Sequence, residues 1–163
     1  MLYYDGATVA PKGSADVRAD TLGELSRMSY ILTTAPETVE MLQTLVQARD
    51  RLDPVTARKV SELWRDYEQT HRIPQEEFVA YQQLVSKADA VWHEAKERSD
   101  YALFEPYLQR IFDSCRRLAE YMQPDKDPYD AQLDRFERGL TRDTCDRFFA
   151  ALRRDLVPLI EQV

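Results

Sequence analysis

The chain has 163 residues and a formal net charge of −7 at pH 7, with 22 basic and 29 acidic side chains. This length suits a single domain with a core of its own. An acidic chain without a basic run argues against nucleic acid as the main partner, because phosphates are bound by clustered Lys and Arg. No apolar run approaches the ~20 residues that a membrane-spanning helix needs, and the first residues do not form a signal peptide. We therefore expect a cytoplasmic protein with neither a membrane nor a nucleic acid as partner.

The first half of the chain predicts three helices with short connections. Residues 1–13 have no helical period, and the first helix is expected from about Ser14 to Leu32. The second begins at Thr34-Ala35-Pro36-Glu37, which has the spacing of a capping box. The third begins at Asp53-Pro54, an N-cap followed by proline, and ends before Pro74. The side chains expected to face inward are Val17, Leu22, Leu25, Ser29 and Leu32, then Val39, Leu42, Leu45 and Val46, then Ala57, Val60, Trp64 and Tyr67.

The longest predicted helix runs from Gln75 to Arg98, a stretch without Gly or Pro. Pro74 suits the first turn, and the acidic residues that follow it complement the helix dipole there. At 1.5 Å per residue the helix would be about 36 Å long. We expect it to be the central helix, ending at Ser99-Asp100. Its inward face is predicted from spacings of three and four to hold Phe78, Tyr81, Val85, Ala88, Trp92 and Ala95.

Three further helices are predicted in the last part of the chain. Ser99-Asp100 leads into a turn through Phe104, and Pro106 restarts a helix that reaches Met122. A short helix from 129 to 136 is stopped by Gly139. Thr141 caps the last helix, which has a predicted kink at Pro158. The apolar side chains of this last helix are Phe148, Phe149, Leu152, Leu156, Leu159 and Ile160.

No stretch alternates with a period of two. The fold class is therefore all-α: a bundle of about six helices with short connections that start at Pro or Asp, in one domain over residues 1–163.

A near-match to a zinc peptidase motif lies in the central helix. His93-Glu94-Ala95-Lys96-Glu97 resembles His-Glu-x-x-His, in which two imidazoles four residues apart hold one metal ion. Here the fourth residue on is a carboxylate, and no third ligand is evident. A solvated face with a Glu94–Arg98 pair four residues apart explains the segment better.

The remaining chemistry-bearing residues favour structural roles. Cys115 and Cys145 lie on apolar faces, which favours buried thiols over a disulfide. The two Cys and the two His, His71 and His93, lack the spacing of a zinc site. We assign no catalytic, cofactor-binding or metal-ligating residue to this chain. An aromatic set that could line a cofactor pocket is better explained as core: Trp64, Tyr67, Tyr81, Trp92 and Phe104.

The order of landmarks resembles a known family. The opening segment reads Tyr4-Asp5-Gly6-Ala7-Thr8-Val9-Ala10-Pro11-Lys12-Gly13 and is followed by Arg18-Ala19 and Leu22. This order is similar to the W-D-x-E-T-x-M-P-x-G…R-A…L signature of the M32 metallocarboxypeptidases (carboxypeptidase Taq family). A second segment resembles the family's H-P-Y-D-x-L-L-D-x-Y-E-P-G-M-T. It reads Asp127-Pro128-Tyr129-Asp130-Ala131-Gln132-Leu133-Asp134-Arg135-Phe136-Glu137-Arg138-Gly139-Leu140-Thr141. Three intermediate matches connect them in order: Arg65-Asp66-Tyr67 with Ile73-Pro74, Trp92 with Ser99-Asp100-Tyr101, and Phe104-Glu105-Pro106-Tyr107-Leu108.

The resemblance implies the N-terminal helical region of a zinc-dependent carboxypeptidase that removes residues from peptide C-termini. The family's zinc is held by His-Glu-x-x-His and a downstream Glu, and none of these positions lies in this chain, so the chain alone is expected to be inactive and metal-free. In the family this region helps to wall the substrate groove. Asp5, Thr8 and Arg18 match the opening motif and are interpreted as structural. Ala7, where the family has Glu, and Arg138, where it has Pro, depart from the pattern.

Two alternatives remain open at this point. The chain is either a region of such an enzyme or a free-standing helical module that binds a protein partner. We also expect a homodimer, formed through the last helix or the N-terminal segment, because the last helix has more apolar surface than one inward stripe needs.

Overall fold

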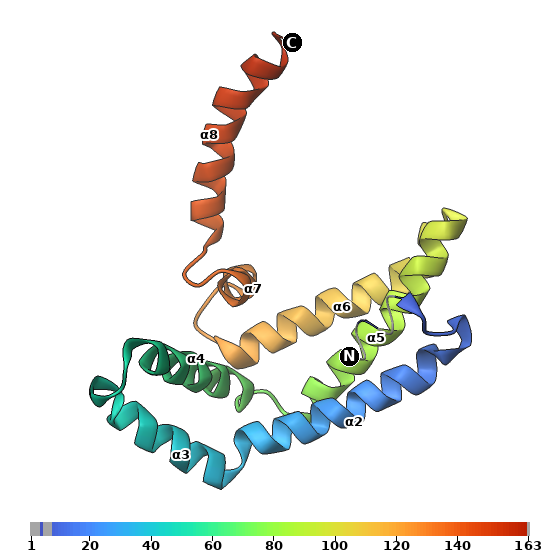
Figure 1. Cartoon of the computed structure of the whole chain (residues 1–163). Coiled ribbons are helices and arrows are strands. Elements are labelled where there is room, and N and C mark those ends of the chain that lie inside the picture. Colours follow the sequence, from blue (N-terminus) through green and yellow to red (C-terminus); the bar gives the residue numbers. More distant parts are fainter. Residues whose placement is uncertain (1–3, 5–7, 163) are drawn as a thin grey trace. The chain divides into compact units, whose positions relative to one another are not determined.

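The computed structural model describes residue 4 and residues 8–162, and within them every regular element is helical (Figure 1). Two short 3-10 helices, η1 (Lys12–Ser14) and η2 (Arg49–Arg51), accompany seven α-helices. These are α2 (Ala15–Thr34), α3 (Pro36–Gln47), α4 (Pro54–Thr70), α5 (Gln75–Arg98), α6 (Tyr101–Met122), α7 (Pro128–Phe136) and α8 (Arg142–Ile160). The predicted all-α class is confirmed. The helices form two compact units, which divide after Ser114.

The first unit is built on the antiparallel pair α2 and α5. Contacts run along the pair from Asp16, whose carboxylate lies 3.3 Å from Lys87 Nζ, to Tyr30 at the other end. Tyr30 Oη donates to the carbonyl of Ile73 at 2.8 Å, and its ring lies 5.6 Å from that of Phe78. Between these ends the contact buries Ala19 and Gly23 of α2 and Leu84 and Ala88 of α5. The predicted central helix is thus confirmed in its bounds and in its packing role.

A glycine allows the close approach of these two helices. A Cβ built on Gly23 would lie 2.5 Å from Gln83 Nε2 and 2.8 Å from two further atoms of that side chain. Atoms that are not bonded do not approach so closely, so the Gln83 side chain occupies the space that any larger residue at position 23 would need. The α2–α5 interface therefore depends on small residues more than on large apolar ones.

Helices α3 and α4 form a second antiparallel pair in this unit, a hairpin whose connection contains η2 (Figure 1). Leu42 and Val60 are its buried apolar side chains. Asp53 caps α4 as predicted, because its Oδ1 accepts from the backbone N–H groups of Val55 and Thr56, both at 3.1 Å. The Thr56 side chain hydrogen-bonds to the Asp53 carboxyl and, together with these backbone hydrogen bonds, holds its pKa below the ordinary value of 3.8.

The predicted capping box at Thr34 is wrong. Ala35 is the N-cap of α3, and it makes no side-chain cap hydrogen bond. Thr34 instead ends α2, and its hydroxyl donates to the carbonyl of Tyr30 at 2.8 Å. Pro36 occupies the first helical position, so the cap falls one residue later than the Thr-x-x-Glu spacing suggested.

Helix α6 begins earlier than predicted. It starts at Tyr101 and includes Pro106, where the sequence predicted a turn followed by a restart. The deciding residue is Asp100, whose Oδ1 accepts from Leu103 N at 3.3 Å and so caps the new helix. The preceding corner is made by Ser99, which has φ 51° and closes α5 with the hydrogen bond Asp100 N to Ala95 O at 2.8 Å.

Two predicted inward faces are also wrong. On α2, Val17 is 70% exposed, and Leu25, Ser29 and Leu32 are exposed as well. On α5, Ala88 and Ala95 are buried as expected, but Trp92 is 41% exposed and Val85 is exposed too. Because α2 and α5 meet through small side chains, the face in contact is not the most apolar one. Of the aromatic set interpreted as core, Trp92 is exposed, and Trp64, Tyr67, Tyr81 and Phe104 are half-buried.

The second unit packs α7 against the last turns of α6. Its buried apolar side chains are Leu118, Ala119 and Met122 of α6 and Ala131 of α7. Gln132 Nε2 donates to the carbonyl of Cys115 at 2.8 Å, which ties the two helices together. The predicted short helix is confirmed. Gly139, with φ +82°, forms the turn that follows it, and such a φ favours glycine.

In the described part of the chain, no helix is long and apolar enough to cross a bilayer.

Candidate functional site

The near-match at His93 forms no metal site. His93 Nε2 lies 3.9 Å from Asp89 Oδ1, and both side chains are well exposed. Glu94 pairs with Arg98 at 2.8 Å, which confirms the predicted pair four residues apart. The segment therefore presents a solvated polar face.

The other potential ligands are also dispersed. A His71 ring nitrogen lies 2.9 Å from the carbonyl of Tyr67, and the two rings stack at 4.7 Å. Cys115 and Cys145 are free thiols and are half-buried. Among residue 4 and residues 8–162, no group of three or more His, Cys, Asp and Glu side chains could hold a metal ion.

The segment from Asp127 to Thr141 is a structural clasp. Asp127 caps α7 by accepting from Tyr129 N at 2.9 Å, and Thr141 caps α8 by accepting from Thr144 N at 3.3 Å. Asp130, in the first turn of α7, accepts from the backbone N–H of Arg142 at 2.7 Å. The acidic residues of this motif thus hold backbone N–H groups at both helix starts.

Asp134 is the centre of this clasp. It is 8% exposed, and its two oxygens accept from Gly139 N and from Gln123 Nε2, each at 2.9 Å. A buried carboxylate is costly unless it is hydrogen-bonded, and here it joins the end of α6, α7 and the turn before α8. The sequence reasoning assigned no role to this residue, although it stands inside the best-matching motif.

The opening motif is described only in part. Thr8 Oγ1 donates to the carbonyl of Tyr4 at 2.7 Å, which fits its structural interpretation. Arg18 is half-buried on α2. Asp5 and Ala7 lie outside the described residues.

A polar hollow of about 360 Å³ lies in the first unit, between α2, α5 and α6. Gln83 and Lys87 line it from α5, and Asp16, which pairs with Lys87, lines it from α2. From α6 come Tyr107 and Arg110, whose guanidinium carbon lies 5.9 Å from the centre of the Tyr107 ring. Such a surface can contact polar peptide groups.

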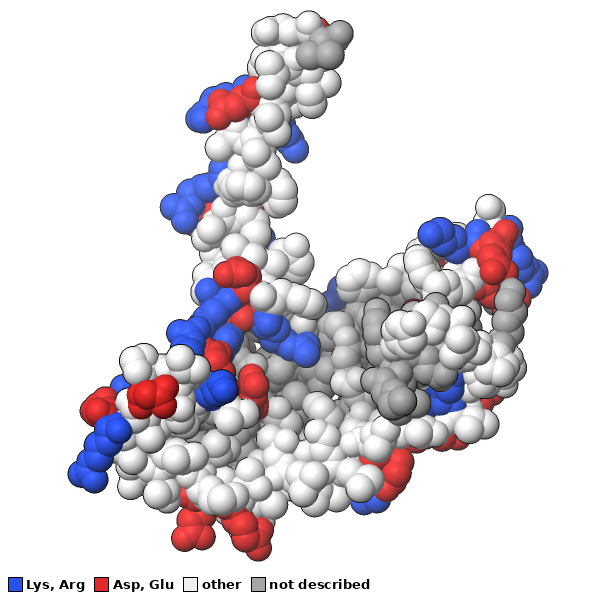
Figure 2. Space-filling model, in the orientation of Figure 1, with Lys and Arg blue, Asp and Glu red and all other residues white. Residues whose placement is uncertain are grey.

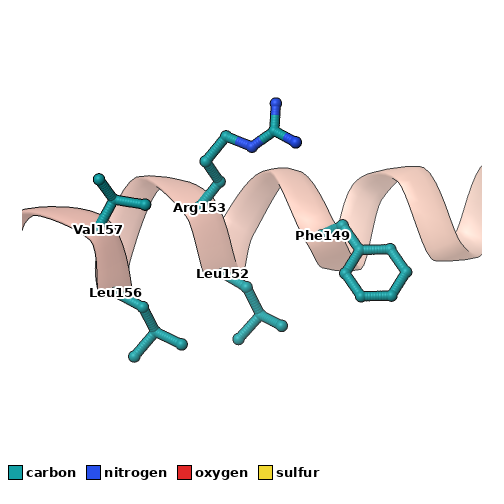
Figure 3. Close-up of a pocket in the computed structure, with 5 residues that line it drawn as sticks. All are labelled: Phe149, Leu152, Arg153, Leu156 and Val157. Atoms are coloured by element: carbon teal, nitrogen blue, oxygen red, sulfur yellow. The ribbon is translucent and has the colours of Figure 1, made fainter. Parts of the chain in front are cut away.

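An open, mostly apolar surface lies along α8 in the second unit. In Figure 3, Phe149, Leu152 and Leu156 point to the same side of the helix, and Arg153 and Val157 project from its other edge. Figure 2 shows charged side chains mostly along one side of α8. On that polar side Arg154 donates to Asp155 at 2.8 and 3.0 Å, which lowers the pKa of the Asp155 carboxyl.

The sequence model of the Carboxypeptidase Taq (M32) metallopeptidase family matches residues 1–163. The chain belongs to the M32 family. This finding agrees with the landmarks that resemble the family signature.

Individual M32 relatives match the whole chain. It is 36% identical to Carboxypeptidase 1 of Bacillus subtilis over 163 residues and 31% identical to Thermostable carboxypeptidase 1 of Pyrococcus furiosus. Among solved structures it is similar to the crystal structure of BsuCP (TM-score 0.92, 35% identity). It is also similar to that of the P. furiosus carboxypeptidase (TM-score 0.76, 31% identity). Each comparison covers 99% of this chain and 32% of the other.

The chain therefore spans about a third of the length of the curated relatives that it matches. The matched third is their N-terminal helical region. The described residues do not fit the metal of a metallopeptidase, because the histidines stand apart and are engaged with Tyr67 and Asp89.

Proposed function

We propose that this chain is the N-terminal helical region of a zinc-dependent M32 carboxypeptidase, an enzyme that releases C-terminal residues from peptides. The region helps to wall the substrate groove and is not catalytic alone. The polar hollow lined by Lys87 and Arg110 is the surface best suited to face a peptide.

The observation that carries this proposal is the match of the whole chain to about a third of each M32 relative. The matched third lacks His-Glu-x-x-His, the pair of imidazoles four residues apart that a zinc peptidase uses. Without a metal-activated water the chain has no candidate nucleophile.

The test is an assay for release of C-terminal residues from an N-blocked dipeptide, with full-length B. subtilis Carboxypeptidase 1 as the positive control. We expect no release by the chain and less than ~0.1 zinc per chain after dialysis, because tight binding needs a preformed ligand set. Chelator-sensitive release that survives repurification, or about one zinc held per chain, would contradict the proposal.

A second candidate function is a free-standing module that binds a protein partner. The observation that favours it is the exposed apolar surface of α8, a feature typical of interaction sites. The intact mass of the protein made from its native locus distinguishes the two. A mass near 19.1 kDa favours the module, and a mass about three times larger favours the enzyme. A cytoplasmic location and a homodimer remain predictions of this proposal.

A further inference from the structure

Helix α8 buries none of its 19 residues. Phe148, Phe149, Leu156 and Ile160 are exposed, by 45 to 71% of their surface. Phe149, Leu152 and Leu156 stand on one side of the helix (Figure 3). In the described part of the second unit, α8 therefore presents an apolar face that nothing covers.

The anchoring of α8 lies at its beginning. Thr141 caps the helix, and the backbone of Arg142 donates to Asp130 of α7. The apolar side chains begin one turn later and continue to Ile160. A helix of this length is marginal in water by itself, and amphipathic helices gain most of their stability by burying the apolar face. The first turn of α8 is therefore held by hydrogen bonds, and the rest of the helix would be stabilised by burying its apolar face against another apolar surface.

We propose that the apolar face of α8, namely Phe149, Leu152, Leu156 and Ile160, docks against the part of an M32 carboxypeptidase that lies outside this chain. The inference rests on the proposed function. The matching chains are about three times as long. The BsuCP structure matches this chain with a TM-score of 0.92, and 68% of its own length lies outside the match. The polypeptide that could cover α8 is thus present in every relative reported above. The partner surface is apolar, because α8 offers it aliphatic and aromatic side chains.

The test places the chain in a complete enzyme. In B. subtilis Carboxypeptidase 1 the matched third is replaced by this chain, and amide hydrogen exchange of α8 is measured in the chimera and in the isolated chain. We expect α8 amides beyond the first turn to exchange at least ~10-fold more slowly in the chimera, because a covered helix opens less often.

Two matched substitutions test which side of α8 is covered. Leu156→Asp adds a carboxylate to the apolar face, and Ala150→Asp adds one to the polar side, near Arg147 and Arg154. Both positions are exposed in this structure, so the two variants of the isolated chain should melt alike at concentrations at which the chain is a monomer. In the chimera we expect Leu156→Asp to lower the melting midpoint by at least ~5 °C more than Ala150→Asp does, since only the former buries a charge.

Several outcomes would overturn the docking proposal. One is α8 exchange that is equally fast in both proteins. Another is equally slow α8 exchange in the isolated chain at a concentration at which it is a monomer, which would mean that this chain covers α8 by itself. If the chimera does not fold, the same replacement in the P. furiosus Thermostable carboxypeptidase 1 is measured, and failure in both scaffolds also counts against the proposal.

Release of C-terminal residues by the chimera is scored separately. An active chimera with fast α8 exchange refutes the docking alone, and an inactive chimera with slow exchange refutes the function alone.

Discussion

Helices α5 and α8 are both long and both carry large apolar side chains, yet they differ in what they bury. Helix α5 buries Leu84, Ala88 and Ala95 and packs along the whole of α2. Helix α8 buries nothing, although it carries Phe148, Phe149 and Leu156. The comparison shows that apolar content alone does not make a core helix. The small residues opposite α5, Ala19 and Gly23, let a neighbour come close, and α8 has no such neighbour within its unit.

The largest expected effect is a contrast between two leucines. Leu84→Ala on α5 should destabilise the chain by about 2–5 kcal/mol, because it empties a packed site. Leu156→Ala on α8 should cost about 0.5 kcal/mol or less, because that side chain is already half exposed. Urea denaturation followed by circular dichroism measures both. Equal losses would mean that the isolated chain covers α8 in some way.

Self-association is the next effect. An uncovered apolar face on α8 should pair the isolated chain into a homodimer at micromolar concentration, and Leu156→Asp should raise the dissociation constant about tenfold, or about 1.4 kcal/mol. Light scattering over a dilution series measures the mass, with Ala150→Asp as the control. A monomer at every concentration would contradict the predicted dimer.

A smaller effect tests the close approach on the α5 side. Gly23→Ala should change stability by less than about 1 kcal/mol, because the gain in helix propensity offsets the displacement of Gln83. With Gln83→Ala already in place, Gly23→Ala should become stabilising, with a coupling of about 0.5–1 kcal/mol between the two sites. A double-mutant cycle by thermal denaturation gives this coupling. Additive changes would show that Gln83 does not fill the space beside Gly23.

The smallest effect is electrostatic and lies on the polar side of α8. The guanidinium of Arg154 lowers the pKa of Asp155, so this pair stabilises the folded state above the ordinary carboxyl pKa of 3.8 and loses its contribution as the pH falls through the lowered value. Arg154→Ala should return the pKa of Asp155 to about its ordinary value. Carboxyl chemical shifts in an NMR titration measure it, and an unchanged titration would disprove the pairing in solution.

Helix bounds could be predicted from the sequence where a side chain or a proline marks them. Pro74 and Ser99 bound α5, and Asp53 and Thr141 cap α4 and α8, all as expected. The start of α6 was missed because Pro106 was weighted above the cap at Asp100. Each of these helix ends is fixed by a residue and its contacts within one turn of the chain.

Helix faces could not be predicted in the same way. Hydrophobic spacing assigns the most apolar side inward, but α2 presents Ala19 and Gly23 to α5 and leaves Val17 and Leu25 outside. Small residues carry little weight in such a pattern, so only the packed partner reveals them. The scaffold role of Asp134 was likewise invisible, because its partners, Gln123 and Gly139, lie 11 and 5 residues away in loops. The family itself was recognisable, because its landmarks occur in order along the chain.

At Gly139 the backbone conformation, and not the space around the residue, limits which substitutions the protein can accept. A Cβ there would meet no atom within 4 Å, so bulk is no obstacle, yet φ is +82°. Asn and Asp adopt positive φ far more readily than alanine or β-branched residues do. In a saturation library, acceptance at position 139 should therefore follow backbone preference and ignore size, with Asn outranking the smaller Ala and with Val and Ile at the bottom.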